Sequence, residues 1–251
     1  MITRIHHVGL VVKDLPSALG FWRDTLDLPA LHLAEVPDQG VLAALLACGT
    51  SEVELLVPTT PDTGIARFLA SRGAGLHHIC VESDDVAHDV RRFIDAGVDM
   101  IDEKPRQGLA GEVAFIHPRA CGGLLVELAT PEAPARLPET PIALAAIHGK
   151  VEDVHAAARR FEDLFRMSRG FAAADGSVVQ LSLAGLVLEL SPVGGEFPKP
   201  TFSALRLRAG SLPALARRLE KRGIPCQANP AGLAVPSGPA QGAPLIIESD
   251  R

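Results

Sequence analysis

One pattern recurs four times along this chain: an apolar strand-like run, a helix, and then several further strand-like runs. The helices begin near Asp14, Asp84–Asp85, Asp153 and Ser211. After each of these positions, apolar residues recur at the three- and four-residue spacing of a helix with one buried face. A fixed order of elements used four times is an internal repeat, and it predicts four modules of βαβββ type.

The predicted fold class is therefore α+β, with four βαβββ modules in two domains. The stretch "TPEAPARLPETP" is rich in proline and polar residues, a composition typical of a linker. We place this linker at residues 131–141, a first domain at 1–130 and a second at 142–251, with two modules in each. A length of 251 residues, 47% of them apolar, suffices for two ordinary cores.

Charge and hydropathy exclude several classes of function. A formal net charge of −6 argues against a nucleic-acid partner, because phosphate binding needs a basic face. The longest apolar runs, Val41–Cys48 and Ile142–Ile147, are far shorter than the roughly 20 residues of a membrane span. The start "MITRIHHVGL" lacks the apolar core of a signal peptide, so we expect a cytoplasmic protein without a membrane partner. The four cysteines form no CxxC pair, which favours reduced, buried thiols.

Two histidine doublets stand inside strand-like runs, in "RIHHVGLVVKDL" and in "GLHHICVESDD". Neighbouring side chains of a strand point to opposite faces, so only one histidine of each pair can face a shared cavity. Glu54 in "EVELLVP" and Glu127 in "LLVELAT" also lie among apolar residues, where a carboxylate needs a partner or a metal ion. Two imidazoles and two carboxylates would suit a borderline divalent cation. Hydrogen-bonded core histidines and solvent-reaching glutamates remain the alternative.

The same segments resemble the vicinal oxygen chelate superfamily, which includes glyoxalases, bleomycin resistance proteins and dioxygenases. Residues 4–129 are similar to methylmalonyl-CoA epimerases within it, through "IHHVGLVVKDL", "EVPDQGV", "EVELLVP", "GLHHICVESDD", "DEKPRQG" and "FIHPRACGGLLVEL". The resemblance implies domains of two βαβββ modules whose curved sheets surround one metal ion. It also implies four metal ligands, His7, Glu54, His78 and Glu127, with His6 and His77 facing away.

The resemblance implies a function as well: epimerisation of a 2-methyl-branched acyl-CoA such as methylmalonyl-CoA. A proton next to the thioester is removed and returned to the other face, through an enediolate stabilised by a divalent ion, Co, Mn, Ni, Zn or Mg. Glu127 is the implied proton carrier. The loop "DEKPRQGLAGE" is a candidate substrate-binding segment, for a CoA phosphate or an acidic substrate, and its alternative is an ordinary solvated loop. Its candidate residues are Lys104, Arg106, Gly108 and Gly111.

The first half departs from the family pattern at two positions. Some family members carry a second catalytic glutamate where this chain has Ala43, which puts a two-base mechanism in doubt. Glu35 or Asp38 in the neighbouring loop could substitute for it. The family also places an aspartate before the first ligand histidine, where this chain has His6.

The second half departs further, because alignment of the predicted helices places Ala146, Leu188 and Ala204 where the first half has ligands. Glu248 alone falls near the position of Glu127. We interpret residues 142–251 as a degenerate copy that binds no metal. The chain would then be a fused pseudo-dimer, working as a monomer or as a homodimer.

Two further functions stay open. One is a glyoxalase-like isomerase or a lyase that acts on another small hydroxy or keto compound. The other is a small-molecule binding or resistance protein without catalysis. A ring-cleaving dioxygenase is less favoured, because such enzymes use two histidines and one carboxylate, and related ones employ a tyrosine that this chain lacks.

Overall fold

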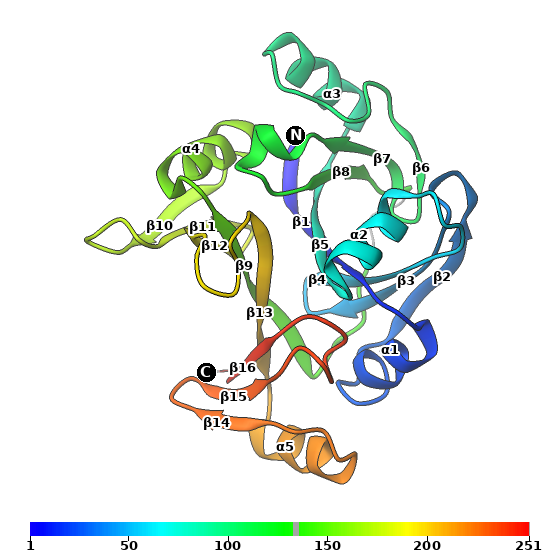
Figure 1. Cartoon of the computed structure of the whole chain (residues 1–251), viewed down its shortest axis with the longest axis vertical. Helices are drawn as coiled ribbons and strands as arrows, with labels where there is room; N and C mark the ends of the chain where they lie inside the picture. Colours follow the sequence, from blue (N-terminus) through cyan, green and yellow to red (C-terminus); the bar gives the residue numbers. More distant parts are fainter. Residues whose placement is uncertain (133–135, 251) are drawn as a thin grey trace. The chain divides into compact units, whose positions relative to one another are not determined.

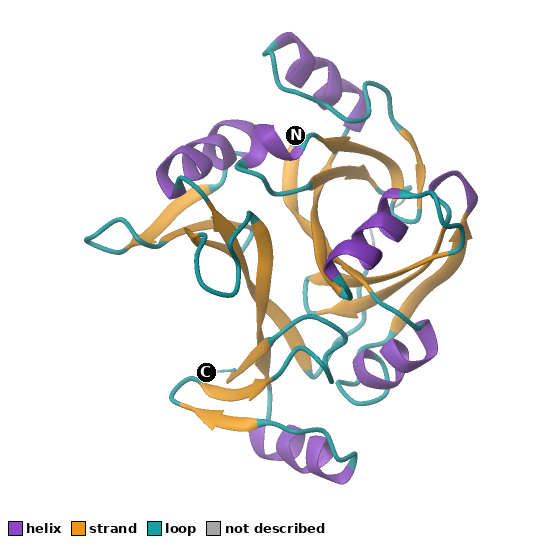
Figure 2. Ribbon diagram, viewed as in Figure 1, coloured by secondary structure: helices purple, strands orange, loops and turns teal. Residues whose placement is uncertain are grey.

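The protein is described here by a computed structural model, which defines residues 1–132 and 136–250. It contains two eight-stranded sheets with helices beside them, which confirms the predicted α+β class (Figures 1 and 2). The strands of the first sheet lie between residues 2 and 130, and those of the second between residues 142 and 249. In each sheet the strand order is that of two βαβββ modules joined through their first strands.

The first sheet has the order β2-β3-β4-β1-β5-β8-β7-β6. Its first module consists of β1 (Ile2–Val11), α1 (Leu15–Trp22), β2 (Ala30–Val36), the 3-10 turn η1 (Pro37–Gln39), β3 (Val41–Cys48) and β4 (Ser51–Pro58). After α2 (Gly64–Arg72), the second consists of β5 (Gly75–Ser83), α3 (Val86–Asp95), β6 (Arg106–Gly108), β7 (Gly111–Ile116), η2 (Pro118–Cys121) and β8 (Val126–Thr130).

The second sheet repeats this order as β10-β11-β12-β9-β13-β16-β15-β14. Its first module consists of β9 (Ile142–Val151), α4 (Val154–Phe165), β10 (Ser168–Ala172), β11 (Val179–Leu183) and β12 (Leu186–Pro192). Its second consists of β13 (Thr201–Ala209), α5 (Leu212–Lys221), β14 (Gln227–Asn229), β15 (Gly232–Val235) and β16 (Leu245–Ser249). The four predicted helices are thus α1, α3, α4 and α5, each following the first strand of its module.

The four repeated helices begin with the same kind of N-terminal cap. The residue before each helix has an extended backbone, and its side chain accepts a hydrogen bond from a backbone N–H in the first turn. These capping residues are Asp14, Asp85, Asp153 and Ser211. The short helix α2 lies outside the repeat and was not predicted. Among the described residues it buries no side chain fully.

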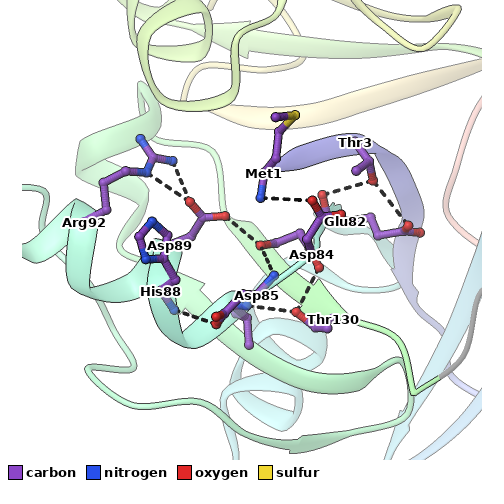
Figure 3. Close-up of polar contacts among 11 residues, drawn as sticks. Met1, Thr3, Glu82, Asp84, Asp85, His88, Asp89, Arg92 and Thr130 are labelled. Atoms are coloured by element: carbon purple, nitrogen blue, oxygen red, sulfur yellow. Dashed lines mark hydrogen bonds and ion pairs between the residues drawn. The ribbon is translucent and has the colours of Figure 1, made fainter.

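Polar contacts fasten the end of β8 to the end of β5 (Figure 3). The hydroxyl of Thr130 donates to the carbonyl of Ser83 at 2.9 Å and accepts from the N–H of Val86 at 2.8 Å. Ser83 in turn donates to the buried carboxylate of Asp89, which also pairs with Arg92. These contacts lie three residues beyond Glu127, so they help to hold the two strands in the register that the candidate site needs.

By contacts between Cα atoms the chain forms two compact units, each containing one module of each sheet. One comprises residues 1–7, 78–135 and 146–203, and the other comprises 8–77, 136–145 and 204–251. In the first unit the rings of Phe93 and Phe165 meet edge to face at 6.1 Å. In the second, Arg218 donates to the carbonyl of Thr25 at 3.1 Å.

The division into domains at 1–130 and 142–251 stays a prediction, and residues 133–135 of the proposed linker lie outside the described residues. No helix within 1–132 and 136–250 has both the length and the apolar character that crossing a membrane requires.

Candidate metal centre

Three of the predicted ligands meet at one point. Atom Nε2 of His7 lies 3.1 Å from Nε2 of His78 and 3.1 Å from Oε2 of Glu127. The separation between Nε2 of His78 and the same carboxylate oxygen is 3.3 Å. All three side chains are buried, with no residue more than 5% exposed. The structure therefore brings two imidazoles and one carboxylate into mutual contact.

Strand pairing explains why these side chains converge. In the parallel pair β5/β8, Cys80 is aligned with Glu127. Because His78 stands two residues before Cys80, it points to the same face of the sheet as Glu127. His7 lies on β1, the neighbour of β5 in the sheet order. One face of three adjacent strands thus supplies all three groups.

Glu54 is the fourth predicted ligand, and it lies on β4, the other neighbour of β1. Its carboxylate is buried, and one of its oxygens lies within 4.8 Å of ligand atoms of His7 and His78. Glu54 is aligned with Leu45 in the pair β3/β4. Ala43, two residues from Leu45, therefore lies on the same face of the sheet as Glu54.

The donor geometry fits a divalent cation. Ligand atoms about 2.1 Å from an ion are separated by about 3.0 Å at adjacent octahedral positions and about 3.4 Å at tetrahedral ones. The three separations among His7, His78 and Glu127 fall in this range. Oε2 of Glu127 is also buried without a well-aligned hydrogen bond, despite the two close ring nitrogens. A buried carboxylate oxygen aimed between two imidazoles is what a metal ion would satisfy.

The electrostatics of the cluster keep Glu127 ionised. Burial alone would raise the pKa of its carboxyl group, but the hydrogen-bonding and electrostatic interactions with His7 and His78 outweigh burial and hold that pKa below its usual range. Glu127 is therefore a carboxylate at neutral pH, the form that binds a cation or accepts a proton.

The two histidine doublets have different environments. Nδ1 of His6 lies 2.9 Å from Nδ1 of His7, and His6 is buried. Burial, followed by the charges of His7 and Arg4, lowers the pKa of His6 to about 2. His77 is half-buried, and its ring meets that of Phe68 edge to face at 4.9 Å. Sequence alternation alone did not predict the contact between His6 and His7.

The cysteines within the described residues form no disulfide. Burial raises the pKa of Cys48 and of Cys121 to about 12, so both thiols stay protonated. Cys80 is different, because its sulfur lies within 4.8 Å of ligand atoms of His6 and His7. The sequence did not predict that Cys80 lies near His6 and His7, because a cysteine in an apolar strand looks like an ordinary core residue.

Arg106 lies on the same face of the sheet as the cluster. It is aligned with Val113 in the pair β6/β7, and Phe115, two residues further, is aligned with Glu127. The guanidinium lies 5.6 Å from the centre of the Phe115 ring, and that ring meets the His78 ring at 5.4 Å. Asp102 fixes this arrangement: it pairs with Arg106 at 3.4 Å and accepts the N–H of Phe115 at 2.9 Å. Neither Asp102 nor Phe115 was predicted from the sequence as a site residue.

The other predicted substrate-binding residues have different surroundings. Lys104 is exposed in the loop before β6. Gly108 and Gly111 are aligned across the turn between β6 and β7. Gly111 has a φ of +98°, and a Cβ there would collide with the carbonyl of Thr130, so this glycine has a structural reason to be present.

The second sheet carries other residues at the corresponding places. Ala146 and Leu188 are buried, and Ala204 is half-buried. The polar side chains pair among themselves: His148 with Glu189 at 2.9 Å, and Arg206 with Glu248 at 3.3 Å. Among the described residues, the groups of His, Cys, Asp and Glu close enough to hold a metal come from the first sheet.

Comparison with known proteins assigns the chain to a superfamily. Residues 6–115 match the sequence profile of the Glyoxalase/Bleomycin resistance protein/Dioxygenase superfamily. The mitochondrial methylmalonyl-CoA epimerase of Mus musculus is 34% identical over 127 residues, which cover 50% of this chain and 71% of that protein. The chain therefore belongs to the Glyoxalase/Bleomycin resistance protein/Dioxygenase superfamily.

Within the superfamily, the N-terminal half is similar to methylmalonyl-CoA epimerases. A solved methylmalonyl-CoA epimerase in complex with methylmalonyl-CoA and NH4+ is 36% identical, with a TM-score of 0.51, and covers 53% of this chain and 97% of that one. A mutant of 4-hydroxymandelate synthase from Streptomyces coelicolor matches 92% of this chain and 78% of its own at 21% identity, with a TM-score of 0.70. The similarity to the synthase covers both halves of the chain and concerns the fold alone.

Proposed function

We propose that this protein is a metal-dependent epimerase of a 2-methyl-branched acyl-CoA, with methylmalonyl-CoA as the first substrate to test. The observation that carries the proposal is the triangle formed by His7, His78 and Glu127, with edges of 3.1 to 3.3 Å. Glu54 adds a second carboxylate, with one oxygen within 4.8 Å of ligand atoms of His7 and His78. The similarity of this half of the chain to epimerases of methylmalonyl-CoA supports the choice of substrate.

The four side chains would hold one divalent ion among Co, Mn, Ni, Zn and Mg. When bound, such an ion supplies positive charge that stabilises a negative oxygen next to the reacting carbon. Glu127 is the proposed proton carrier, because it is ionised and buried beside the two imidazoles. Burial of the surrounding residues excludes bulk water, which strengthens these charge interactions.

Arg106 is the proposed contact for an anionic group of the substrate. Its Nη1 atom is buried, and within residues 1–132 and 136–250 it has no hydrogen-bond partner. Phe115 separates its guanidinium from His78, so an anion bound there would lie on the same face of the sheet as the proposed metal centre. A substrate carboxylate or a CoA phosphate could satisfy this donor.

We expect the substitution Arg106→Ala to raise KM for methylmalonyl-CoA by about 10-fold or more, since a hydrogen bond to a charged group contributes roughly 1.5–3 kcal/mol. Steady-state kinetics of the metal-loaded protein would measure the change. Arg119, an exposed arginine paired with Asp99 at 3.3 Å, supplies the matched control Arg119→Ala. Equal effects of the two substitutions would contradict a specific role for Arg106.

Two measurements test the proposed function. Metal analysis of the purified protein should find about one divalent ion per chain, in accordance with a single centre. Incubation with methylmalonyl-CoA in deuterated water should then place deuterium at the carbon next to the thioester. A protein that holds its metal but exchanges no proton would be no epimerase of this substrate.

One observation favours a second candidate, a glyoxalase-like isomerase or a lyase acting on another small hydroxy or keto compound. Ala43 is fully buried on the face of Glu54, so this position offers no second base. Glu35 and Asp38, the suggested substitutes, are both exposed. A reaction that needs a single proton carrier would tolerate this arrangement. Proton exchange with solvent on small hydroxy or keto compounds, without proton exchange on methylmalonyl-CoA, would favour this second candidate function.

The second half of the chain is proposed to be a degenerate copy, in a fused pseudo-dimer. This follows from Ala146, Leu188 and Ala204 at the expected ligand positions. Metal content is again the test, because two equivalent ions per chain would contradict it. Sedimentation measurements would distinguish a monomer from a homodimer.

A further inference from the structure

The two rings of the first histidine doublet are in contact with each other. Nδ1 of His6 and Nδ1 of His7 are 2.9 Å apart, and both residues are buried, at 3% and 0% exposure. The corresponding His77 packs on Phe68. Two buried imidazoles at this separation share one proton in a hydrogen bond, and either nitrogen could carry it.

A metal ion on His7 would decide between the two arrangements. Nε2 of His7 is the atom that faces His78 and Glu127, so it is the atom available to a cation. A neutral imidazole that binds metal through Nε2 carries its proton on Nδ1. The acceptor 2.9 Å from that nitrogen is Nδ1 of His6. His6 would then have to present an unprotonated Nδ1.

We propose that His6 is a positioning residue that accepts the Nδ1 proton of His7 and so directs the lone pair of His7 Nε2 toward the metal. This inference rests on the proposed metal centre. Its physical basis is the common arrangement in which the second ring nitrogen of a metal ligand donates to a fixed acceptor, which sets the tautomer and the ring orientation. Here a neutral imidazole takes the place of the more usual carboxylate or carbonyl.

The substitutions His6→Leu and His6→Asn test the proposal together. Leucine removes the acceptor, whereas the side-chain oxygen of asparagine can stand close to the place of the histidine Nδ1 and accept the same proton. We expect His6→Leu to weaken Zn or Co binding by about 10–100-fold. His6→Asn should bind close to the wild-type level. His77→Leu is the matched control from the second doublet and should leave metal affinity unchanged.

The readouts are metal affinity, by competition with a chelator, and nitrogen NMR of the His7 ring in the metal-loaded wild type. The NMR spectrum should show a protonated Nδ1 and a metal-bound Nε2. Because neither readout uses catalysis, a protein that binds metal but fails to exchange methylmalonyl-CoA protons would leave this inference intact.

Four results would overturn the inference. The first is a folded His6→Leu variant with wild-type affinity, and the second is an Asn variant as weak as the Leu variant. The third is a His7 bound through Nδ1, as it would be if His6, His7 and Cys80 formed the centre. The fourth is a wild-type protein that binds none of Co, Mn, Ni, Zn and Mg, which would also remove the proposed metal centre.

Discussion

Replacement of Glu127 by glutamine is expected to slow the exchange of the substrate proton by about 10²–10⁴-fold, the usual contribution of a positioned general base. Glutamine has nearly the same shape, but its amide accepts no proton at neutral pH. Its side-chain oxygen can still contact a cation between His7 and His78. Metal binding should therefore weaken less than catalysis. Deuterium incorporation into methylmalonyl-CoA and metal content, measured on the same sample, separate the two effects.

The second half of the chain provides a control for Glu127→Gln. Glu248 lies in β16, the corresponding strand of the second sheet, and pairs with Arg206 at 3.3 Å. The register of β13 and β16 places Ile246 at the position that corresponds to Glu127, and Glu248 two residues beyond it. The substitution Glu248→Gln therefore removes the same charge from the corresponding strand and should leave proton exchange unchanged. A Glu127→Gln variant that retains metal and wild-type exchange would eliminate Glu127 as the proton carrier.

The fold could be predicted from the sequence because its signals are local. Helix caps and apolar spacing mark each module, and the same order recurs four times, so errors at one boundary do not hide the repeat. The helix α2 was not predicted, because it lies outside the repeat; among the described residues it buries no side chain fully. The order of the strands in each sheet, with the first strands of the two modules side by side, was not predicted from the sequence.

The candidate site could be predicted only in part. Strand alternation indicates that one histidine of each doublet faces a cavity, but it does not say which; His7 and His78 came from the resemblance. Contacts between residues far apart in sequence left no local signal. Phe115 against His78 and Asp102 beside Arg106 are of this kind, because they depend on how β7 and β6 follow β8.

The absence of a carboxylate at Ala43 bears directly on the proposed reaction. Epimerisation needs a proton to leave one face of the carbon and return to the other. Glu127 is a single carboxylate, so it would serve one of these faces. We expect Ala43→Glu to raise the rate of epimerisation by about 10²-fold, toward the lower end of the range for an added general acid or base. The register of β3 and β4 directs this side chain to the face that carries Glu54. Coupled assays that consume one epimer would measure the rate.

The expected rate gain of Ala43→Glu depends on whether the variant remains folded, because the new carboxylate would be buried. Ala43 is 0% exposed, and burial of an unpaired carboxylate is unfavourable by several kcal/mol unless a cation or a donor satisfies it. The variant should therefore have a lower Tm without metal and recover part of it when metal is added. Ala43→Gln has the same size without the basic group, so it isolates the proton-transfer effect from the steric one. If the Glu and Gln variants both fold, bind metal and epimerise at the same rate, a second base is not what limits this protein, and a reaction that needs one proton carrier becomes the better account of its site.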